Sequence, residues 1–369
     1  MLKEKNVNLV QVSASLQPKL GGPCAVVIGT FPYFATHYNC KLLVFGSTTF
    51  NSEHTEINST FLNNRFGFRF KIPNRISRIS MKNADVLMIH GYYLWSTLLA
   101  FYYSKCQDIY LMPHGSLEHY QDKNGKFRKN IFNKIAKHLL KKRTLHFLLG
   151  SDAEISSVRD KFANSKISVV GLGVDYNIND CLLSGLHNPI NLLCLSRISP
   201  EKRIDLCIRA MVILNLSDRK YQLNIYGSGD VALEAELRSL VKSLDLEDVI
   251  HFKGHVDGFE KVLAIKNSDI MLLPSENENF ALAVAESIAF GKPVVVSKFV
   301  AMHEFVDTNS TGLTIDELDV NELVFAIKEI SNEFSTYQEN CTTSAHLLAW
   351  EQVIKRWFHV IDNSLSVKK

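Results

Sequence analysis

The stretch DIMLLPSENENFALAVAESIAFGKPVVVS, residues 269–297, decides the fold of this chain. It begins with a strand-like segment, DIMLLPS, and continues through a polar loop into a helical pattern. Gly291, Lys292 and Pro293 end that helix, and a second apolar strand, VVVS, follows. This alternation is the building unit of open α/β sheets, which bind ligands beyond the carboxyl ends of their strands.

Two carboxylates stand eight residues apart in this stretch, Glu278 in the loop and Glu286 in the helical pattern. Eight residues are about two helical turns, so two carboxylates at this spacing can face the same direction. The spacing is compatible both with a chance pair of surface glutamates and with a pair that binds a ligand.

The second half of the chain repeats the same alternation. Short apolar segments predict strands at 191–196, 222–227, 248–254, 269–275 and 293–297. Helical patterns lie between them at 203–215, 230–245, 257–267 and 281–290. Strands and helices that alternate in this way predict a parallel, doubly wound sheet.

The first half shows the same theme less regularly. Its strand-like segments are VNLVQVS, KLLVFGS, DVLMIHG, DIYLMPHG, LHFLLGS and ISVVGLG. A chain of 369 residues is too long for one ordinary core, and the polar, proline-ended segment 175–189 is typical of a linker. We therefore expect a Rossmann-like domain at 1–175, a second at 188–345, and a C-terminal helix at 346–369.

The composition predicts a soluble, cytoplasmic protein. Hydrophobic residues make up 46% of the chain and charged residues 21%, no apolar run reaches the ~18 residues that span a bilayer, and MLKEKNVNL lacks a signal-peptide core. The seven cysteines are odd in number and form no C-x-x-C pair, which favours reduced thiols over a disulfide framework or a zinc site.

Positive charge is concentrated in the first half. Residues 1–180 hold 23 Lys and Arg against 12 Asp and Glu, and the run 123–143 holds nine Lys and Arg with no acid. This run fits either a solvated helix face or a peripheral contact with an anionic membrane or lipid phosphate. Nucleic acid is not an expected partner, because the chain shows no nucleic-acid-binding motif.

Two cations follow the first strand of the second half, in SRISPEKRID (196–205). Arg197 and Lys202 flank Ser199, a candidate N-cap, and Pro200, a candidate first helical residue. Two cations beside exposed helix amides can clamp a diphosphate, although surface charges that cap a helix would look the same.

Glycines and histidines follow other strand-like segments. Gly22 in LGGP and Gly227 in YGSGD would allow the backbone to approach a ligand closely, although the glycines of a tight βα turn would look the same. His114 in MPHGSL and His90 in IHGYYLW each follow a strand, so they compete for a catalytic or a structural role.

The combination of SRISPEKRID, IYGSGD, FKGHV, the 269–297 stretch and HEFVDTNSTGL resembles family 4 of the retaining glycosyltransferases. These are nucleotide-sugar enzymes of the GT-B fold. The five elements occur in the family's order across about 190–315, whereas the first half is similar only in LGGP, HG, PHGSL and the GVD at 173–175. The resemblance implies two doubly wound Rossmann-like α/β domains facing a cleft, with a last helix near Trp350 that crosses back to the N-terminal domain.

The resemblance also implies roles for single residues. Glu278 would reach hydroxyls of the donor sugar, and Glu286 would hold the ribose, because a carboxylate accepts two hydrogen bonds from a vicinal diol. Arg197 and Lys202 would bind the diphosphate. The other implied contacts are backbone amides at Phe280, Ala281 and Leu282, glycine loops at Gly22 and Gly227, and the cleft histidine, His114. Ala281 departs from the family, which usually has glycine there.

The implied function is that of a retaining, metal-independent hexosyltransferase in bacterial surface polysaccharide or lipopolysaccharide assembly. A UDP- or GDP-type sugar would be the donor, and a glycan or lipid-linked hydroxyl at the inner membrane face the acceptor. No cofactor or metal is expected, because the sequence has no D-x-D triplet and two cationic side chains would neutralise the diphosphate. A GT-B epimerase and a degenerate transferase used as a binding subunit remain alternatives; the second would explain Ala281.

Overall fold

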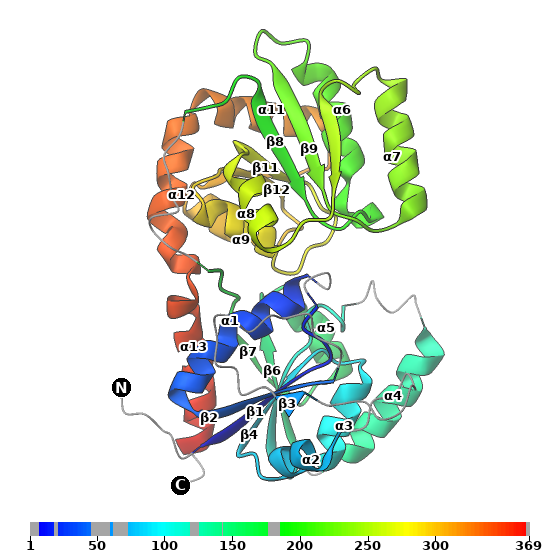
Figure 1. Ribbon diagram of the computed structural model, residues 1–369, viewed down its shortest axis with the longest axis vertical. Helices are drawn as coiled ribbons and strands as arrows, with labels where there is room; N and C mark the ends of the chain where they lie inside the picture. Colours follow the sequence, from blue (N-terminus) through cyan, green and yellow to red (C-terminus); the bar gives the residue numbers. More distant parts are fainter. Residues whose placement is uncertain are drawn as a thin grey trace. The chain divides into compact units, whose positions relative to one another are not determined.

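The computed structural model describes residues 7–17, 21–45, 60–61, 73–118, 125–141, 143–175 and 185–366. The chain forms two compact units, one of Met1–Leu172 with Val353–Lys369 and the other of Gly173–Gln352. Each unit has its own parallel sheet with helices on both faces (Figure 1). Residues 176–184 of the predicted linker lie outside these described ranges. None of the helices in the described ranges is long and apolar enough to cross a membrane.

The N-terminal unit is built on a seven-stranded parallel sheet with the order β3-β2-β1-β4-β5-β6-β7. Its strands are β1 (Asn8–Ser13), β2 (Asn39–Val44), β3 (Thr60–Phe61), β4 (Val86–His90), β5 (Asp108–Met112), β6 (Thr144–Leu149) and β7 (Lys166–Val169). Its helices are α1 (Gly22–His37), α2 (Arg75–Lys82), α3 (Trp95–Tyr103), α4 (Lys126–Leu139), α5 (Glu154–Lys161) and, from Val353 onward, α13 (Trp350–Ser366). The strand order reverses between β1 and β4, where doubly wound sheets bind their ligands.

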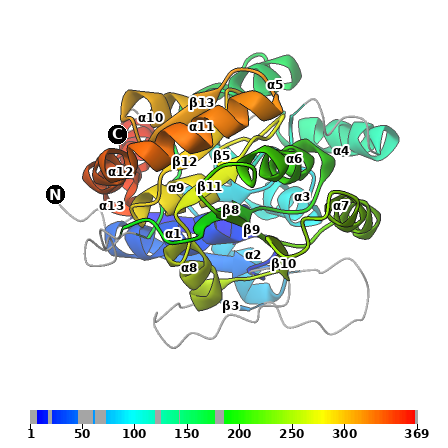
Figure 2. The same cartoon turned by 90° about the horizontal axis from the view of Figure 1, so that it is seen from above.

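Apolar packing on both faces explains why the central strands are hydrophobic throughout. Every residue of β4 is buried, as expected for a parallel strand covered on both sides. The helices α2, α3, α4 and α5 contribute to the core on one face of this sheet. On the other face α1 and α13 lie side by side (Figures 1 and 2), with the rings of Phe34 and Trp357 6.0 Å apart.

The C-terminal unit is built on a six-stranded parallel sheet with the order β10-β9-β8-β11-β12-β13. Its strands are β8 (Ile190–Leu195), β9 (Tyr221–Tyr226), β10 (Ile250–Gly254), β11 (Ile270–Leu273), β12 (Val294–Ser297) and β13 (Gly312–Ile315). Its helices are η4 (Pro200–Lys202), α6 (Ile204–Leu214), α7 (Val231–Ser243), α8 (Gly258–Lys266), α9 (Leu282–Ala289), α10 (His303–Thr308), α11 (Val320–Asn332) and α12 (Phe334–Leu348). The predicted doubly wound α/β class is confirmed, and the order reverses between β8 and β11.

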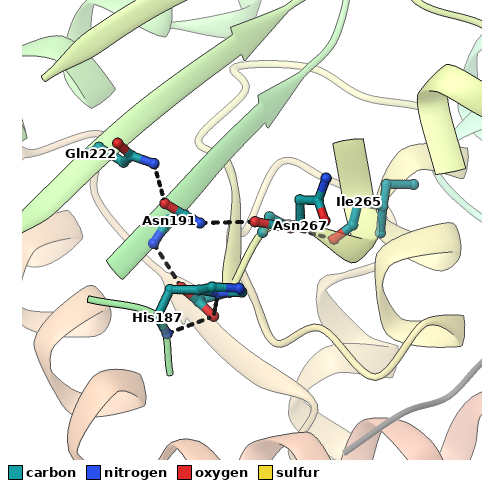
Figure 3. A network of polar contacts seen from close by, with 7 residues as sticks. His187, Asn191, Gln222, Ile265 and Asn267 are labelled. Atoms are coloured by element: carbon teal, nitrogen blue, oxygen red, sulfur yellow. Dashed lines mark hydrogen bonds and ion pairs between the residues drawn. The ribbon is translucent and has the colours of Figure 1, made fainter. Parts of the chain in front are cut away.

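A polar network holds β8 against β11 at the amino edge of this sheet (Figure 3). Asp269, which is fully buried, accepts a 2.7 Å hydrogen bond from the backbone N–H of Asn191 and lies 2.7 Å from Nδ1 of His187. The side chain of Asn191 donates to the carbonyl of Asn267 and accepts from Gln222. These contacts fix the start of both strands beside the point where the strand order reverses.

The C-terminal helix differs from the expected single helix at 346–369. The chain leaves α12 at Leu348, becomes extended at Ala349 and enters α13 at Trp350. Ala349 interrupts the helix because it forms a bridge with Val174, whose N–H donates to the carbonyl of Leu348 over 2.9 Å. Only glycine fits at 173 beside this crossing, since a Cβ there would lie 2.6 Å from the ring of Trp350.

Candidate functional site

The predicted site residues of the C-terminal unit lie at the carboxyl edge of its sheet, in three loops and in helix α9, which follows one of them. These loops follow β8, β9 and β11, and two of them touch through a bridge between Ile198 and Gly229. This contact requires glycine at 227 and 229. A Cβ at Gly227 would lie 1.8 Å from the carbonyl oxygen of Ser196, and a Cβ at Gly229 would lie 2.1 Å from that of Ile198. The glycines therefore have a packing role, and a ligand contact at Gly227 stays a prediction.

The loop after β8 carries the two predicted diphosphate cations in different environments. The side chain of Arg197 is 71% exposed and its guanidinium lies 3.7 Å from Glu201. Lys202 is buried, with a side chain 8% exposed, and forms an ion pair with Glu278. Its burial brings a positive charge to the base of the loop.

Ser199 stands at the N-cap position of η4, but its side chain does not make the predicted capping hydrogen bond. The Ser199 hydroxyl donates a 2.7 Å hydrogen bond to the Glu201 carboxylate, and no side-chain cap forms on η4. Pro200 does occupy the first helical position, but the turn it opens is a short 3-10 helix. The α-helix itself begins at Ile204, after Arg203 takes a left-handed conformation with φ 49°.

The two glutamates of the 269–297 stretch stand on different elements, as the strand–loop–helix pattern predicted. Glu278 lies in the loop before α9, and Glu286 lies within α9. A bridge to Val300 holds the Glu278 backbone beside the loop that follows β12. Helical geometry therefore does not align the two side chains, and each has its own lysine partner.

Glu286 belongs to a charge cluster that sequence reasoning missed. Nζ of Lys261, on α8, lies 2.5 Å from Oε1 of Glu286, and both side chains are largely buried. Burial raises the pKa of Glu286, while the charge of Lys261 opposes the rise and Asp175 adds to it. Burial also raises the pKa of Asp175, again against the charge of Lys261. The charge of Lys261 thus acts on two acids that the sequence had marked, Glu286 itself and Asp175 in the GVD element, whereas Lys261 had no signal of its own.

Ala281 opens α9 in a left-handed conformation, with φ 63° and ψ 63°. No side chain caps this helix, so the amides of the first turn, which include Leu282, are available to an anion. Phe280 and Leu282 pack partly buried against the core around Ala281. This backbone has the form of the amide-presenting turn expected at Phe280, Ala281 and Leu282, and the ligand contact itself stays a prediction.

In the N-terminal unit, Gly22 is the first residue of α1. Its N-cap, Gly21, is left-handed with φ 68°, and no side chain caps the helix. A Cβ at Gly21 would meet no atom within 4 Å, so the backbone conformation rather than crowding selects glycine there.

His90 and His114, which the sequence presented as competitors, are in contact. His90 ends β4, His114 follows β5, and Nδ1 of His90 lies 3.0 Å from Nε2 of His114. Burial lowers the pKa of His114 to about 4, and burial with the charge of His114 lowers that of His90 further. Both rings are therefore neutral near pH 7. The left-handed His114 turn is held by the Glu154 carboxylate, which accepts the N–H of Gly115 over 3.0 Å.

The fold and the loops at the carboxyl edges define a two-domain α/β protein of the GT-B class. Solved structures show this fold over nearly the whole chain. Anabaena Alr3699/HepE in complex with UDP-glucose superposes with a TM-score of 0.74 at 16% identity, over 96% of this chain and 99% of that one. The lipopolysaccharide outer core galactosyltransferase WaaB, in its apo form, gives 0.66 at 17% identity, over 96% and 99%.

Residues 185–345 match the model of the family Glycosyl transferases group 1. The amylovoran biosynthesis glycosyltransferase AmsK of Erwinia amylovora is 30% identical over 173 residues, which are 45% of this chain and 42% of that protein. The match thus spans less than half the length of this relative. The resemblance to the group is confirmed, and membership of family 4 stays a prediction.

Proposed function

We propose that the protein transfers a hexose from a nucleotide diphosphate sugar to a hydroxyl of a glycan or lipid-linked acceptor, with retention at the anomeric carbon. The observation that carries this proposal is the pairing at the carboxyl edge of the C-terminal sheet. There Glu278 meets Lys202 and Glu286 meets Lys261 beside the uncapped helix α9. The two carboxylates can bind the diols of a sugar and a ribose, and the cations and free amides can bind a diphosphate.

The proposed reaction needs no group outside the substrates and these side chains. The acceptor oxygen attacks the anomeric carbon while the bond from that carbon to the diphosphate oxygen breaks, and the leaving diphosphate takes the acceptor proton. Lys202 and Arg197 stabilise the charge that grows on the diphosphate, which is the largest expected contribution to the rate. Glu278 contacts the transferred sugar and Glu286 holds the ribose, while a role for His114 in sugar binding stays a prediction. Metal is not required, so activity should survive EDTA.

Relatives favour a role in surface polysaccharide assembly. AmsK is named for amylovoran biosynthesis and WaaB for the outer core of lipopolysaccharide. Because HepE binds UDP and UDP-glucose, UDP sugars are the first donors to test, with GDP sugars second.

The surface of α4 combines exposed apolar and basic side chains, as expected for a protein whose acceptor is bound to a membrane. Phe127, Ile131 and Ile135 are 77%, 44% and 44% exposed at a spacing of four residues, so they form one apolar stripe. The lysines and the arginine of α4 flank this stripe, and no acid interrupts them. We propose that this face lies on an anionic membrane surface.

The test is a thermal-shift screen with UDP, GDP, ADP and their sugars, followed by product analysis. A ligand at 100 times its dissociation constant stabilises the protein by about 2.7 kcal/mol. Release of nucleoside diphosphate only with acceptor present, and a product of unchanged anomeric configuration, would support the transferase. Epimerised donor without release would support the epimerase, and binding without turnover of any donor the degenerate subunit.

A further inference from the structure

We infer that a buried chain of hydrogen bonds, running from α1 through β1 and β4, fixes His114 as the tautomer with its proton on Nδ1. The chain consists of the carbonyl of Val26, Thr30, Gln11, His90 and His114. In this form His114 offers an N–H donor, and its use toward a sugar oxygen rests on the proposed function.

The polarity of the chain is set at its helical end. The hydroxyl of Thr30 donates to the carbonyl of Val26, four residues earlier in α1, over 2.8 Å. A hydroxyl has a single proton, so Thr30 Oγ1 can only accept from Gln11, whose Nε2 lies 3.0 Å away. This contact therefore requires the amide nitrogen of Gln11, and not its oxygen, to face Thr30.

The same nitrogen faces His90 over 2.8 Å and donates its second proton to Nε2 of that ring. Because Nε2 accepts and the ring is neutral, the proton of His90 lies on Nδ1. Nδ1 of His90 then donates to Nε2 of His114 over 3.0 Å. His114 must in turn carry its own proton on Nδ1.

The reverse polarity is less favourable for a specific reason. Gln11, Thr30 and His90 are almost fully buried, and Oε1 of Gln11 has no partner among the described residues. Rotating the amide would satisfy this oxygen, but it would leave both N–H groups of the same amide buried without partners. It would also take the Thr30 proton from the Val26 carbonyl. Unpaired buried donors are rarer than underused carbonyl oxygens, so the observed orientation is the stable one.

The assignment makes Thr30, Gln11 and His90 positioning residues for His114. None of them needs to touch substrate, and their effect passes through the proton position on the last ring. The arrangement explains why Gln11 of β1, His90 at the end of β4 and His114 after β5 are grouped beside the point where the strand order reverses.

The experiment is long-range ¹H–¹⁵N NMR of the imidazole rings in the full chain without substrate, with His90→Gln and His114→Gln used for assignment. The expected spectrum shows neutral Nδ1–H tautomers for both rings at pH 7, the opposite of the form that free histidine prefers in water. An Nε2–H signal or tautomer averaging at His114 would overturn the inference.

Matched variants at one position separate polarity from packing. Thr30→Ser keeps the hydroxyl and should keep the Nδ1–H signal, whereas the similarly sized Thr30→Val should produce mixed tautomers. Gln11→Glu, a second variant, places an acceptor beside His90 and should move the ring protons or charge that ring. An unchanged tautomer in both Thr30→Val and Gln11→Glu would refute the relay.

The kinetic readout distinguishes this inference from the proposed function. Thr30→Val should lower kcat about three- to tenfold, as expected for one misdirected hydrogen bond, with UDP affinity unchanged. The NMR result stands without any transferase activity, so a correct tautomer in a protein that transfers no sugar would refute only the proposed function.

Discussion

Replacing Glu278 with glutamine should tighten the binding of bare UDP, although it should slow sugar transfer. In the free protein the charge of Lys202 is already paired with Glu278, and the two side chains are 8% and 23% exposed. A diphosphate that recruits Lys202 must compete with this pair. Glutamine keeps the shape of the side chain and one acceptor oxygen, but it removes the competing charge.

The magnitude follows from the kind of bond that is lost. A hydrogen bond to a charged group contributes about 1.5–3 kcal/mol and a neutral one about 0.5–1.5 kcal/mol. The variant should therefore free roughly 1–2 kcal/mol for the diphosphate, which corresponds to a UDP dissociation constant about five- to thirtyfold lower. Turnover should fall because Glu278 is proposed to contact the transferred sugar, whose interactions change in the transition state.

Calorimetry with UDP on the folded variant measures the affinity, and steady-state assays measure kcat. Glu276→Gln is the matched control, because Glu276 is more exposed and pairs at 3.1 Å with Arg203 rather than with Lys202. An exposed pair contributes little, so the control should bind UDP as the unchanged protein does. Weaker or equal UDP binding by Glu278→Gln would show that Lys202 does not leave Glu278 for the diphosphate.

Three further predictions concern other charged and apolar groups. Lys261→Met should weaken UDP binding about tenfold in calorimetry, because buried Glu286 would lose the cation that favours its ionised form. Burial lowers the pKa of His146 to about 4, so the unfolded chain takes up a proton between about pH 6.5 and 4 that the folded chain refuses. The free energy of unfolding, measured with urea, should therefore fall less steeply with decreasing pH in His146→Gln, by up to about 1.4 kcal/mol per pH unit. Phe127→Ser should weaken co-sedimentation with anionic vesicles about tenfold or more, since burying a Phe contributes about 1.5–3 kcal/mol.

The Lys261 and Phe127 predictions have matched controls. Lys253→Met changes an exposed lysine of the same unit, and Phe259→Ser an equally exposed phenylalanine outside α4. Tighter UDP binding by Lys261→Met would mean that Lys261 competes with the ribose. Equal vesicle binding by the two Phe variants would show that α4 is not the membrane face. If the free energy of unfolding of His146→Gln falls with pH as steeply as that of the unchanged protein, His146 is protonated in the folded chain.

The alternation of apolar and helical segments sufficed to predict the sheet, because parallel strands covered on both faces must be apolar throughout. The strand β13 escaped notice because its GLTI is short and follows the polar turn of HEFVDTNSTGL. The break at Ala349 could not be predicted either, since a helical pattern does not reveal a bridge to Val174.

The ion pairs of the site were beyond sequence reasoning for a different reason. Lys202 and Glu278 are separated by 76 residues, and Lys261 and Glu286 by 25, and no periodicity relates such positions. The motif marked both glutamates and Lys202 one at a time, while Lys261 sits within an ordinary helical pattern. Only the folded structure shows that each glutamate has a cationic partner: the loops after β8 and β11 lie next to each other and bring Lys202 to Glu278, and Lys261 on α8 reaches Glu286 on α9.

Ala281 raised the question of a degenerate enzyme, and the structure shows why it need not be one. The residue adopts the left-handed backbone that glycine would take there, with φ 63°. For a residue with a Cβ this conformation costs roughly 1–2 kcal/mol. The buried methyl returns about 0.8 kcal/mol, and the smaller loss of chain entropy relative to glycine returns about 0.4–1 kcal/mol. Because these contributions nearly cancel, Ala281→Gly should change the free energy of unfolding by less than about 1 kcal/mol. The amides of α9 should keep their positions, so UDP affinity and kcat should stay within about threefold. Urea unfolding, calorimetry and a steady-state assay test this directly, and a large gain in turnover on restoring glycine would show instead that Ala281 had impaired an ancestral transferase.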